Sequence, residues 1–119
     1  MEYRWLDDYC LSKKGAEKDF KEEWNATRYL VRGKMFVMQG GDKKGTPIIT
    51  IKCEPSFGRF LREEYEDIIP GYYMNKVHWN SVYIGGKVPD EVVKQMIDMS
   101  YSLIVASFSR KIQKEIVEE

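Results

Sequence analysis

The residues best suited to nucleophilic or acid–base chemistry in this chain are one histidine and two cysteines. His78 is the sole histidine, so no second imidazole is present for a metal site or a proton relay. Cys10 falls on the apolar side of an expected helix, and Cys53 has only Lys52 beside it to favour a thiolate. Motifs for a nucleophile elbow, a phosphate-binding glycine loop, a zinc protease or a calcium loop do not occur. We therefore predict a protein that is not an enzyme and has no metal or organic cofactor.

The surroundings of His78 allow two interpretations. Asn75 and Lys76 stand just before it, and Trp79 follows it, so the group could bind an anion. Alternatively, the Asn75 side chain caps a turn while His78 donates a hydrogen bond to a backbone carbonyl group. Specific-looking polar clusters are only probabilistic signs of a site, and both interpretations stay open at this point.

Positive charge is concentrated in the middle of the chain. The formal net charge is zero, with 19 Lys+Arg against 19 Asp+Glu. Residues 28–62, however, hold eight basic residues against two acidic ones, and acidic segments flank them. Such a stretch could be a footprint for phosphate groups, or it could be the solvated faces of strands. The zero net charge counts against a protein that coats nucleic acid through bulk charge.

Length and composition are those of an ordinary globular protein. A chain of 119 residues with 43% hydrophobic and 32% charged residues predicts one domain over residues 1–119. The longest apolar run, residues 103–106, is too short to cross a membrane, and the charged residues 1–9 do not resemble a secretory leader. Two cysteines are too few for a disulfide framework. We expect a cytoplasmic protein, monomeric or weakly dimeric, with no membrane contact.

The elements that must position these residues can be placed from hydrophobic spacing and turn residues. Residues 2–12 predict a first helix that Gly15 ends, and Phe20 and Trp24 anchor a first strand. The glycine-rich stretch 40–47 predicts a long mobile loop, or wing, between two strands. The remaining expected elements are strands at 29–31, 35–38, 48–51, 72–74 and 79–84, a helix from Pro55 to Tyr65, and a final helix opened by Pro89.

The order of these elements leads to a family resemblance. Residues 70–82 read Pro-Gly-Tyr-Tyr-Met-Asn-Lys-Val-His-Trp-Asn-Ser-Val, which is similar to the signature of the MmcQ/YjbR family. Weaker matches cover most of the chain from the first helix to about Phe108. They lie at Gly15-Ala16-Glu17 with Phe20, and in the stretches 31–36, 52–55, 61–65 and 88–91 with Ser100-Tyr101. Two positions depart from the family pattern: Lys14 replaces a proline, and bulky Phe57 replaces a small residue next to Gly58.

The resemblance implies a fold and suggests an activity. The fold is α+β with two layers, an antiparallel sheet with helices on one face in the order α-β(3-4)-α-β(2)-α, as in secretion chaperones. Family members are labelled DNA-binding through a "double wing" likeness, which is an analogy between folds. On this hypothesis DNA is the partner, bound mostly through phosphate contacts near an aromatic side chain. The candidate residues are Arg32, Lys43 and Lys44 as the wing residues, together with Arg28, Lys76, His78 and Trp79.

The rival hypothesis is a protein-interaction or adaptor module. A sheet covered by helices on one face leaves its other face, and its edges, available to a protein partner. Tyr72, Tyr73, Trp79 and Tyr83 are the aromatic residues that could line such a surface. A contiguous exposed aromatic patch would favour a protein partner, and a clustered positive face with shielded aromatics would favour DNA.

Overall fold

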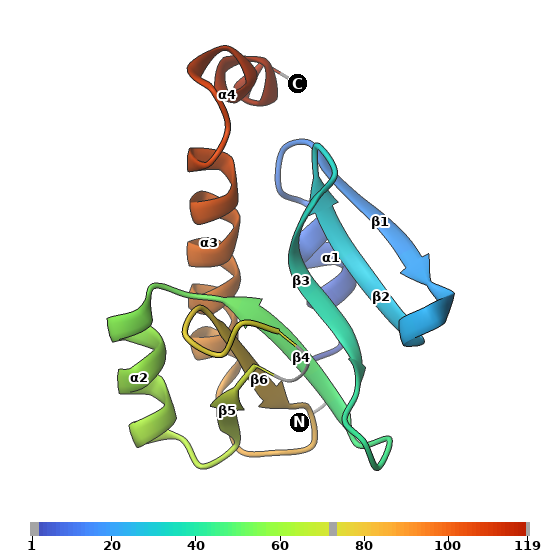
Figure 1. Ribbon diagram of the computed structural model, residues 1–119, viewed down its shortest axis with the longest axis vertical. Helices are drawn as coiled ribbons and strands as arrows, with labels where there is room; N and C mark the ends of the chain where they lie inside the picture. The colour runs from blue at the N-terminus through green and yellow to red at the C-terminus, as the bar shows by residue number, and fades with distance from the viewer. Residues whose placement is uncertain (1–2, 72–73, 119) are drawn as a thin grey trace.

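The computed structural model describes residues 3–71 and 74–118 and contains a six-stranded antiparallel sheet with four α-helices (Figure 1). A 3₁₀ turn, Glu22–Trp24, joins the first two strands. The elements are α1 Leu6–Leu11, β1 Ala16–Lys21, β2 Ala26–Val31, β3 Lys34–Gly41, β4 Pro47–Lys52, α2 Pro55–Glu64, β5 Ile68–Pro70, β6 Trp79–Tyr83, α3 Asp90–Ala106 and α4 Arg110–Val117.

The strands lie in the order β1-β2-β3-β4-β6-β5, and all neighbouring pairs are antiparallel. The connection between β2 and β3 is a two-residue turn, because Val31 pairs directly with Lys34. Both turn residues have positive φ, 49° at Arg32 and 82° at Gly33. Such a turn matches the natural twist of a hairpin, and glycine adopts this backbone without steric cost.

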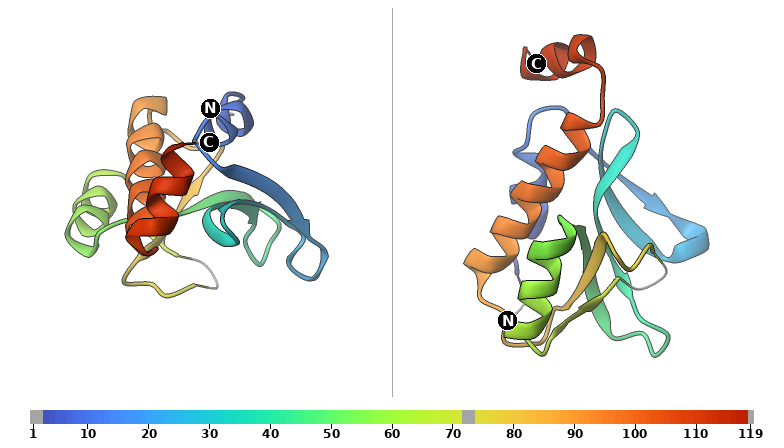
Figure 2. Two further views of the ribbon diagram at one scale, coloured as in Figure 1. Left: turned by 90° about the horizontal axis from the view of Figure 1, so that it is seen from above. Right: turned by 60° about the vertical axis from the view of Figure 1, so that its left-hand side comes forward.

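Helices α1 and α3 cover one face of the sheet, and α2 lies beside β5 (Figure 2). Helix α3 packs across β3 and β4, where the Ser100 hydroxyl donates a hydrogen bond to the Phe36 carbonyl oxygen at 2.6 Å. Between the layers lies one apolar core. Its fully buried members include Val31, Phe36, Val37, Ile49, Ile51, Val82, Val93, Met96 and Ile97.

The opposite face of the sheet, called the open face below, is covered by none of the helices that the structure describes. Side chains alternate along a strand, so Ile48 and Thr50 point to the open face while Ile49 and Ile51 face α3. Instead of a helix, the segment 74–78 passes in front of this face (Figures 1 and 2). The side chains that the register places on the open face of the four central strands are Ala26, Arg28, Leu30, Met35, Met38, Ile48, Thr50, Lys52, Trp79, Ser81 and Tyr83.

The α+β fold with helices on one face of an antiparallel sheet is confirmed. Helix α2 begins with Pro55 at its first turn, and α3 begins at Asp90 directly after Pro89, as the sequence predicts. Gly15 has the expected positive φ of 74° after the first helix. The charged tail forms a separate helix, α4, because the Ser109 side chain caps it by accepting a hydrogen bond from the Ile112 N–H.

Several predicted boundaries were wrong. Trp24 belongs to the 3₁₀ turn and not to the first strand. The long loop is shorter than predicted, since β3 continues to Gly41 and β4 begins at Pro47. The break expected after α2 is itself extended, since Ile68–Pro70 forms β5 and pairs with β6. Of the strand expected at residues 72–74, only Met74 is described, and it lies in a bend. Tyr72 and Tyr73 lie outside the described residues.

A candidate binding site on the open face

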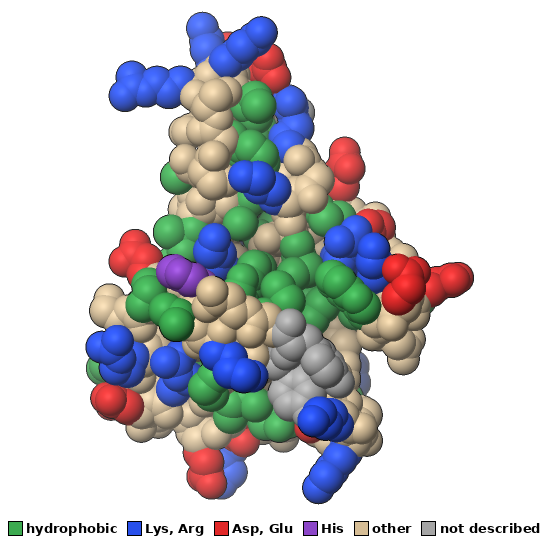
Figure 3. All heavy atoms as spheres, viewed as in Figure 1, with side chains coloured by type: hydrophobic (Ala, Val, Ile, Leu, Met, Phe, Trp, Pro, Cys, Tyr) green, Lys and Arg blue, Asp and Glu red, His purple; other side chains and the backbone are tan. Residues whose placement is uncertain are grey.

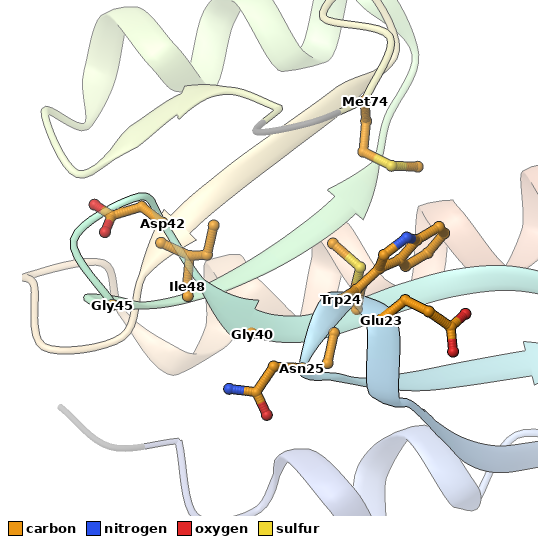
Figure 4. A pocket seen from close by; sticks show the side chains of 11 residues that line it. Glu23, Trp24, Asn25, Gly40, Asp42, Gly45, Ile48 and Met74 are labelled. Carbon is orange, nitrogen blue, oxygen red and sulfur yellow. The ribbon is translucent and has the colours of Figure 1, made fainter.

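A cavity of about 660 Å³ opens on the open face, between the turn that follows β1 and the turn that follows β3 (Figure 4). Three segments distant in sequence form it: residues 23–26, residues 38–48, and Met74 from the segment in front of the sheet. Figure 3 shows this side of the molecule, where hydrophobic side chains gather in the middle and Lys and Arg side chains stand around them. The lining residues are Glu23, Trp24, Asn25, Ala26, Met38, Gly40, Gly41, Asp42, Gly45, Ile48 and Met74.

Trp24 is the large aromatic side chain of this cavity and is 52% exposed. The 3₁₀ turn that carries it ends at Asn25, whose φ of 48° reverses the chain into β2. Two cations lie against the indole ring: Lys21 Nζ is 5.4 Å and Arg28 Cζ is 5.8 Å from its centroid. An exposed aromatic face flanked by cations can hold a flat ring and a negative group side by side.

The floor of the cavity is apolar. Met38 and Ile48 are almost fully buried, at 5% and 1% exposure, although no described helix covers them. The wall beside them has no side chains because it consists of glycines. A Cβ on Gly40 would lie 3.3 Å from the Ala26 Cβ, and one on Gly41 would lie 3.3 Å from the backbone of Gly45. Glycine therefore keeps this wall open and close to the neighbouring backbone.

The turn between β3 and β4 is organised by Asp42. Its carboxylate accepts hydrogen bonds from the Lys44 N–H at 2.9 Å, the Thr46 N–H at 3.0 Å and the Tyr83 hydroxyl at 3.3 Å. These bonds, above all that from the Thr46 backbone, lower the pKa of Asp42 below its ordinary value. The side chains of Lys43 and Lys44 are exposed on this turn, between two residues that line the cavity.

The segment in front of the sheet is fixed by its own polar residues. The Asn75 side-chain oxygen accepts from the Val77 N–H at 2.9 Å, and the Asn75 carbonyl accepts from the Trp79 N–H at 2.9 Å. Lys76 Nζ donates to the Gly71 carbonyl oxygen at 3.1 Å. The interpretation of Asn75 as a turn cap is confirmed. The backbone carbonyl oxygen of His78 accepts a hydrogen bond from the Cys53 N–H at 2.8 Å, whereas the His78 imidazole is exposed.

Asn80, near the end of the family-like stretch, is fully buried. Its side-chain oxygen accepts from Arg62 of α2, and its amide nitrogen lies 3.4 Å from the His78 carbonyl oxygen. A Cβ on Gly58 would come within 2.9 Å of the same amide, so a glycine is needed where α2 crosses β6. These contacts hold a helix on a strand and leave the amide no access to a ligand.

The two cysteines are structural. Cys10 and Cys53 are both 0% exposed and unpaired. Burial raises the pKa of each thiol to about 12. Neither forms a useful thiolate near neutral pH, which agrees with the lack of an activating neighbour in the sequence. Among residues 3–71 and 74–118, no group of three or more His, Cys, Asp or Glu side chains is arranged to hold a metal ion.

The structure separates the seven candidate residues into groups. Arg28, Lys43 and Lys44 lie beside the cavity, because Arg28 contacts Trp24 and the two lysines stand on the turn between Asp42 and Gly45. Lys76 follows Met74 by two residues along the chain, and its Nζ is bonded to the Gly71 carbonyl oxygen. His78 and Trp79 stand at the start of β6. Trp79 is about 13 Å along that strand from Tyr83, the residue that pairs with Ile48 of the cavity.

Arg32 does not belong with Lys43 and Lys44 in one wing. It lies at the opposite end of β3, a strand about 23 Å long, and its guanidinium is 3.1 Å from Glu115 of α4. The register explains the separation, because hairpin turns at successive ends of one strand must point in opposite directions. Arg28 is also held within the chain, by two bonds of 2.9 and 2.6 Å to Asp19 on the neighbouring strand.

Sequence reasoning missed Trp24, Lys21, Met38, Ile48 and Met74 as site residues. The spacing of Trp24 from Phe20 indicates a strand anchor, because aromatic residues in such positions are usually buried. The signal that could have identified it is the following Asn-Ala pair, which places Trp24 in a turn. Met38 and Ile48 carry no such signal, since only the register shows that they point away from the helices.

Within the part of the chain that the structure describes, none of the helices has the length and apolar composition required to cross a bilayer.

Comparisons with known proteins agree on one family. The model of the family YjbR matches residues 11–103. The "Uncharacterized protein YjbR" of Escherichia coli K12 is 31% identical over 113 residues, which is 95% of each chain, and the "Uncharacterized protein YbdF" of Escherichia coli O157:H7 is 32% identical over 74% of this chain and 71% of its own.

Solved structures give the same result. The crystal structure of the Deinococcus radiodurans protein DR2400, with the family domain DUF419, has a TM-score of 0.83 and 26% identity over 93% of this chain and 84% of its own. A protein from Pseudomonas syringae shares the fold, with a TM-score of 0.74 and 22% identity over 87% of this chain and 98% of its own. The match of the family model over most of the chain, together with the full-length relative, establishes that the chain belongs to the YjbR family.

Proposed function

We propose that the protein is a non-enzymatic, cytoplasmic DNA-binding protein that holds DNA across the open face, at the cavity beside Trp24. The observation that carries this proposal is the half-exposed indole with Lys21 and Arg28 against its ring. Proteins that bind nucleic acid without reading its sequence combine aromatic platforms for bases with cations for the backbone. The double-wing likeness alone would have placed the DNA contacts on the hairpin turns and not at Trp24.

The arrangement of charge supports backbone contacts around the cavity. Lys43 and Lys44 are exposed on the turn that lines it, and Lys76 lies two residues beyond Met74, while Glu23 and Asp42 belong to its lining. Phosphate groups would therefore lie on the border and not inside. None of the described helices lies on this face, so the proposal includes no recognition helix in a DNA groove.

The structure changes the expected salt dependence. Five phosphate contacts, from Arg28, Arg32 and the three lysines, would give a log–log slope of about −4.5 on duplex DNA. The two arginines are bonded to Asp19 and Glu115. If both stay in these ion pairs, at most three of these five contacts remain, and the slope falls to about −2.7 on duplex and about −2.1 on single strands.

A protein partner is the second candidate, favoured by the methionine-lined floor. Met38 and Met74 face the cavity, and flexible methionine side chains adapt to varied apolar surfaces. Phe20, 56% exposed on the other side of β1, adds apolar surface at a sheet edge. Of the four aromatic residues expected to line such a surface, Trp79 and Tyr83 are half-buried, and Tyr72 and Tyr73 lie outside the described residues.

Charge reversal tests the DNA proposal. We expect the double variant K43E/K44E to weaken binding of labelled DNA by about tenfold or more in fluorescence anisotropy at 50 mM salt, because two phosphate contacts become repulsive. The matched control is K111E/K114E, which makes the same charge change on α4 at the other end of the molecule. Equal affinities for the wild type and both variants would remove the β3–β4 turn from the site. No DNA binding by the wild type would direct attention to protein partners.

A further inference from the structure

We infer that the cavity beside Trp24 is a pocket for one unpaired nucleobase, so that the preferred ligand is single-stranded DNA. This inference rests on the proposed function and specifies its ligand. A nucleobase combines a flat apolar face with a polar edge, and both features have a counterpart in the cavity. The arrangement is shown in Figure 4, where Trp24 and Met74 lie on one side and Gly45, Asp42 and Ile48 on the other.

The size and walls of the cavity suit a flat ring. Its volume of about 660 Å³ lies within the range of pockets that enclose small organic ligands. Trp24 offers a ring face, Met38 and Ile48 give an apolar floor, and the glycines at 40 and 41 give a wall without side chains. Stacking on an exposed aromatic ring is favourable for every base, because each base has a π face.

The charges around the cavity separate base from phosphate. The charged residues of the lining are Glu23 and Asp42, and Figure 4 shows their carboxylates pointing away from the space between Trp24 and Ile48, where they form part of the rim and disfavour a phosphate group. Lys21 stands outside the lining, against the Trp24 ring, with its Nζ 3.4 Å from the Glu23 carboxylate. A nucleotide would therefore enter base first, with its phosphate left on the cationic border. An anion alone would not enter the cavity.

The same carboxylates predict which bases are preferred. Asp42 Oδ2 accepts a long 3.3 Å bond from the Tyr83 hydroxyl, and a carboxylate oxygen has a further lone pair that can accept another hydrogen bond. The amino groups of cytosine and adenine are donors of this kind, and carboxylates recognise cytosine N4 in this way. Thymine lacks an exocyclic amino group. We expect oligo-dC and oligo-dA to bind more tightly than oligo-dT.

Duplex DNA cannot use the pocket without losing a base pair. In a duplex each base is stacked on both faces, and extruding one requires unstacking and unpairing it. Duplex DNA would thus contact only the cations of the border. The same base chemistry is available from a free nucleoside, which lacks the phosphates that the border binds.

The experiment compares 12-mers of dC, dA and dT with a duplex of equal length by fluorescence anisotropy at 50 mM salt. We expect Trp24→Ala to weaken single-strand binding about tenfold or more, in line with the loss of one stacked base, and duplex binding by less than threefold. Trp24→Phe should restore most of the affinity because it retains an aromatic face. Phe20→Ala is the matched control: it removes an equally exposed aromatic side chain from the other face of the sheet, and should change affinity less than twofold.

A second arm uses cytidine, adenosine and thymidine at millimolar concentration, read as Trp24-dependent quenching of tryptophan fluorescence. Equal binding of duplex and single strands with no effect of Trp24→Ala would overturn the base pocket and leave DNA binding intact. Failure of every DNA at 50 mM salt would refute the proposed function. In that case, Trp24-dependent binding of cytidine or adenosine would support the pocket as a nucleoside site, and its absence would overturn the pocket too. Because Trp24 is half exposed, its variants should fold, and thermal melting of each variant verifies this.

Discussion

Replacing Asn80 should destabilise the protein without involving any ligand. Asn80 lies within the stretch that resembles the family signature, so a functional role would be the first guess. In the structure, however, its buried side chain joins Arg62 of α2 to β6. Asn80→Ala removes this bond and leaves a cavity against Gly58, where the amide now packs.

The size of the effect follows from the type of bond. A hydrogen bond to a charged group contributes about 1.5–3 kcal/mol, more than a neutral one. Arg62 is half-buried and can turn partly toward water, which keeps the loss within this range. We expect a decrease of about 2–3 kcal/mol in the free energy of unfolding. For a chain of 119 residues this corresponds to a Tm lower by about 8–12 °C.

Urea unfolding of Asn80→Ala, Arg62→Ala and the double variant measures the effect and its origin. The double-mutant cycle should give a coupling energy above about 1 kcal/mol, because the two side chains are bonded directly. Gln113→Ala is the control: its amide donates a neutral 2.8 Å bond to the Phe108 carbonyl oxygen, and its loss should cost less than about 1 kcal/mol. Additive effects of the two variants, or unchanged stability with impaired DNA binding, would refute the structural role.

Three further predictions concern other parts of the chain. Both Cys10 and Cys53 should resist a thiol reagent at pH 8 in the native state and react in guanidinium chloride, because burial raises each thiol pKa to about 12; fast native labelling would contradict this. The pKa of Asp42 is lowered on folding, so its stabilisation is present above the ordinary value of 3.8 and is lost as the pH falls through the lowered value. Urea unfolding at a series of pH values should show that Asp42→Asn is less stable than the wild type at pH 7 and loses less stability as the pH falls. Gly71→Ala would place a Cβ 2.6 Å from the Trp79 Cβ and should lower the free energy of unfolding by about 2 kcal/mol or more. Gly85→Ala, whose Cβ would meet nothing within 4 Å, should leave the Tm nearly unchanged in thermal melting.

Much of the fold could be predicted because its signals are local. Pro55 and Pro89 mark helix starts, since a proline needs no N–H partner there. Gly15 marks a point of positive φ after the first helix, as expected. Each of these residues specifies a backbone conformation that its immediate neighbours do not change.

The candidate site was harder to predict because it depends on register and on contacts between distant segments. Arg28 and Arg32 add to a basic stretch in the sequence, yet each faces a carboxylate that only the folded chain brings near it. Met74 reaches the cavity from a segment far along the chain from Trp24. Local patterns record neither pairing across strands nor which side of a sheet remains uncovered.

The central claim is that DNA binds at the cavity on the open face. Chemical-shift mapping of the ¹⁵N-labelled protein with a dC 12-mer tests it most directly. The account predicts the largest backbone changes at residues 21–28, 38–48 and 74–76, with little change at Arg32 and along α4. Changes that cluster at Arg32 and α4, or that are spread evenly over the surface, would contradict it.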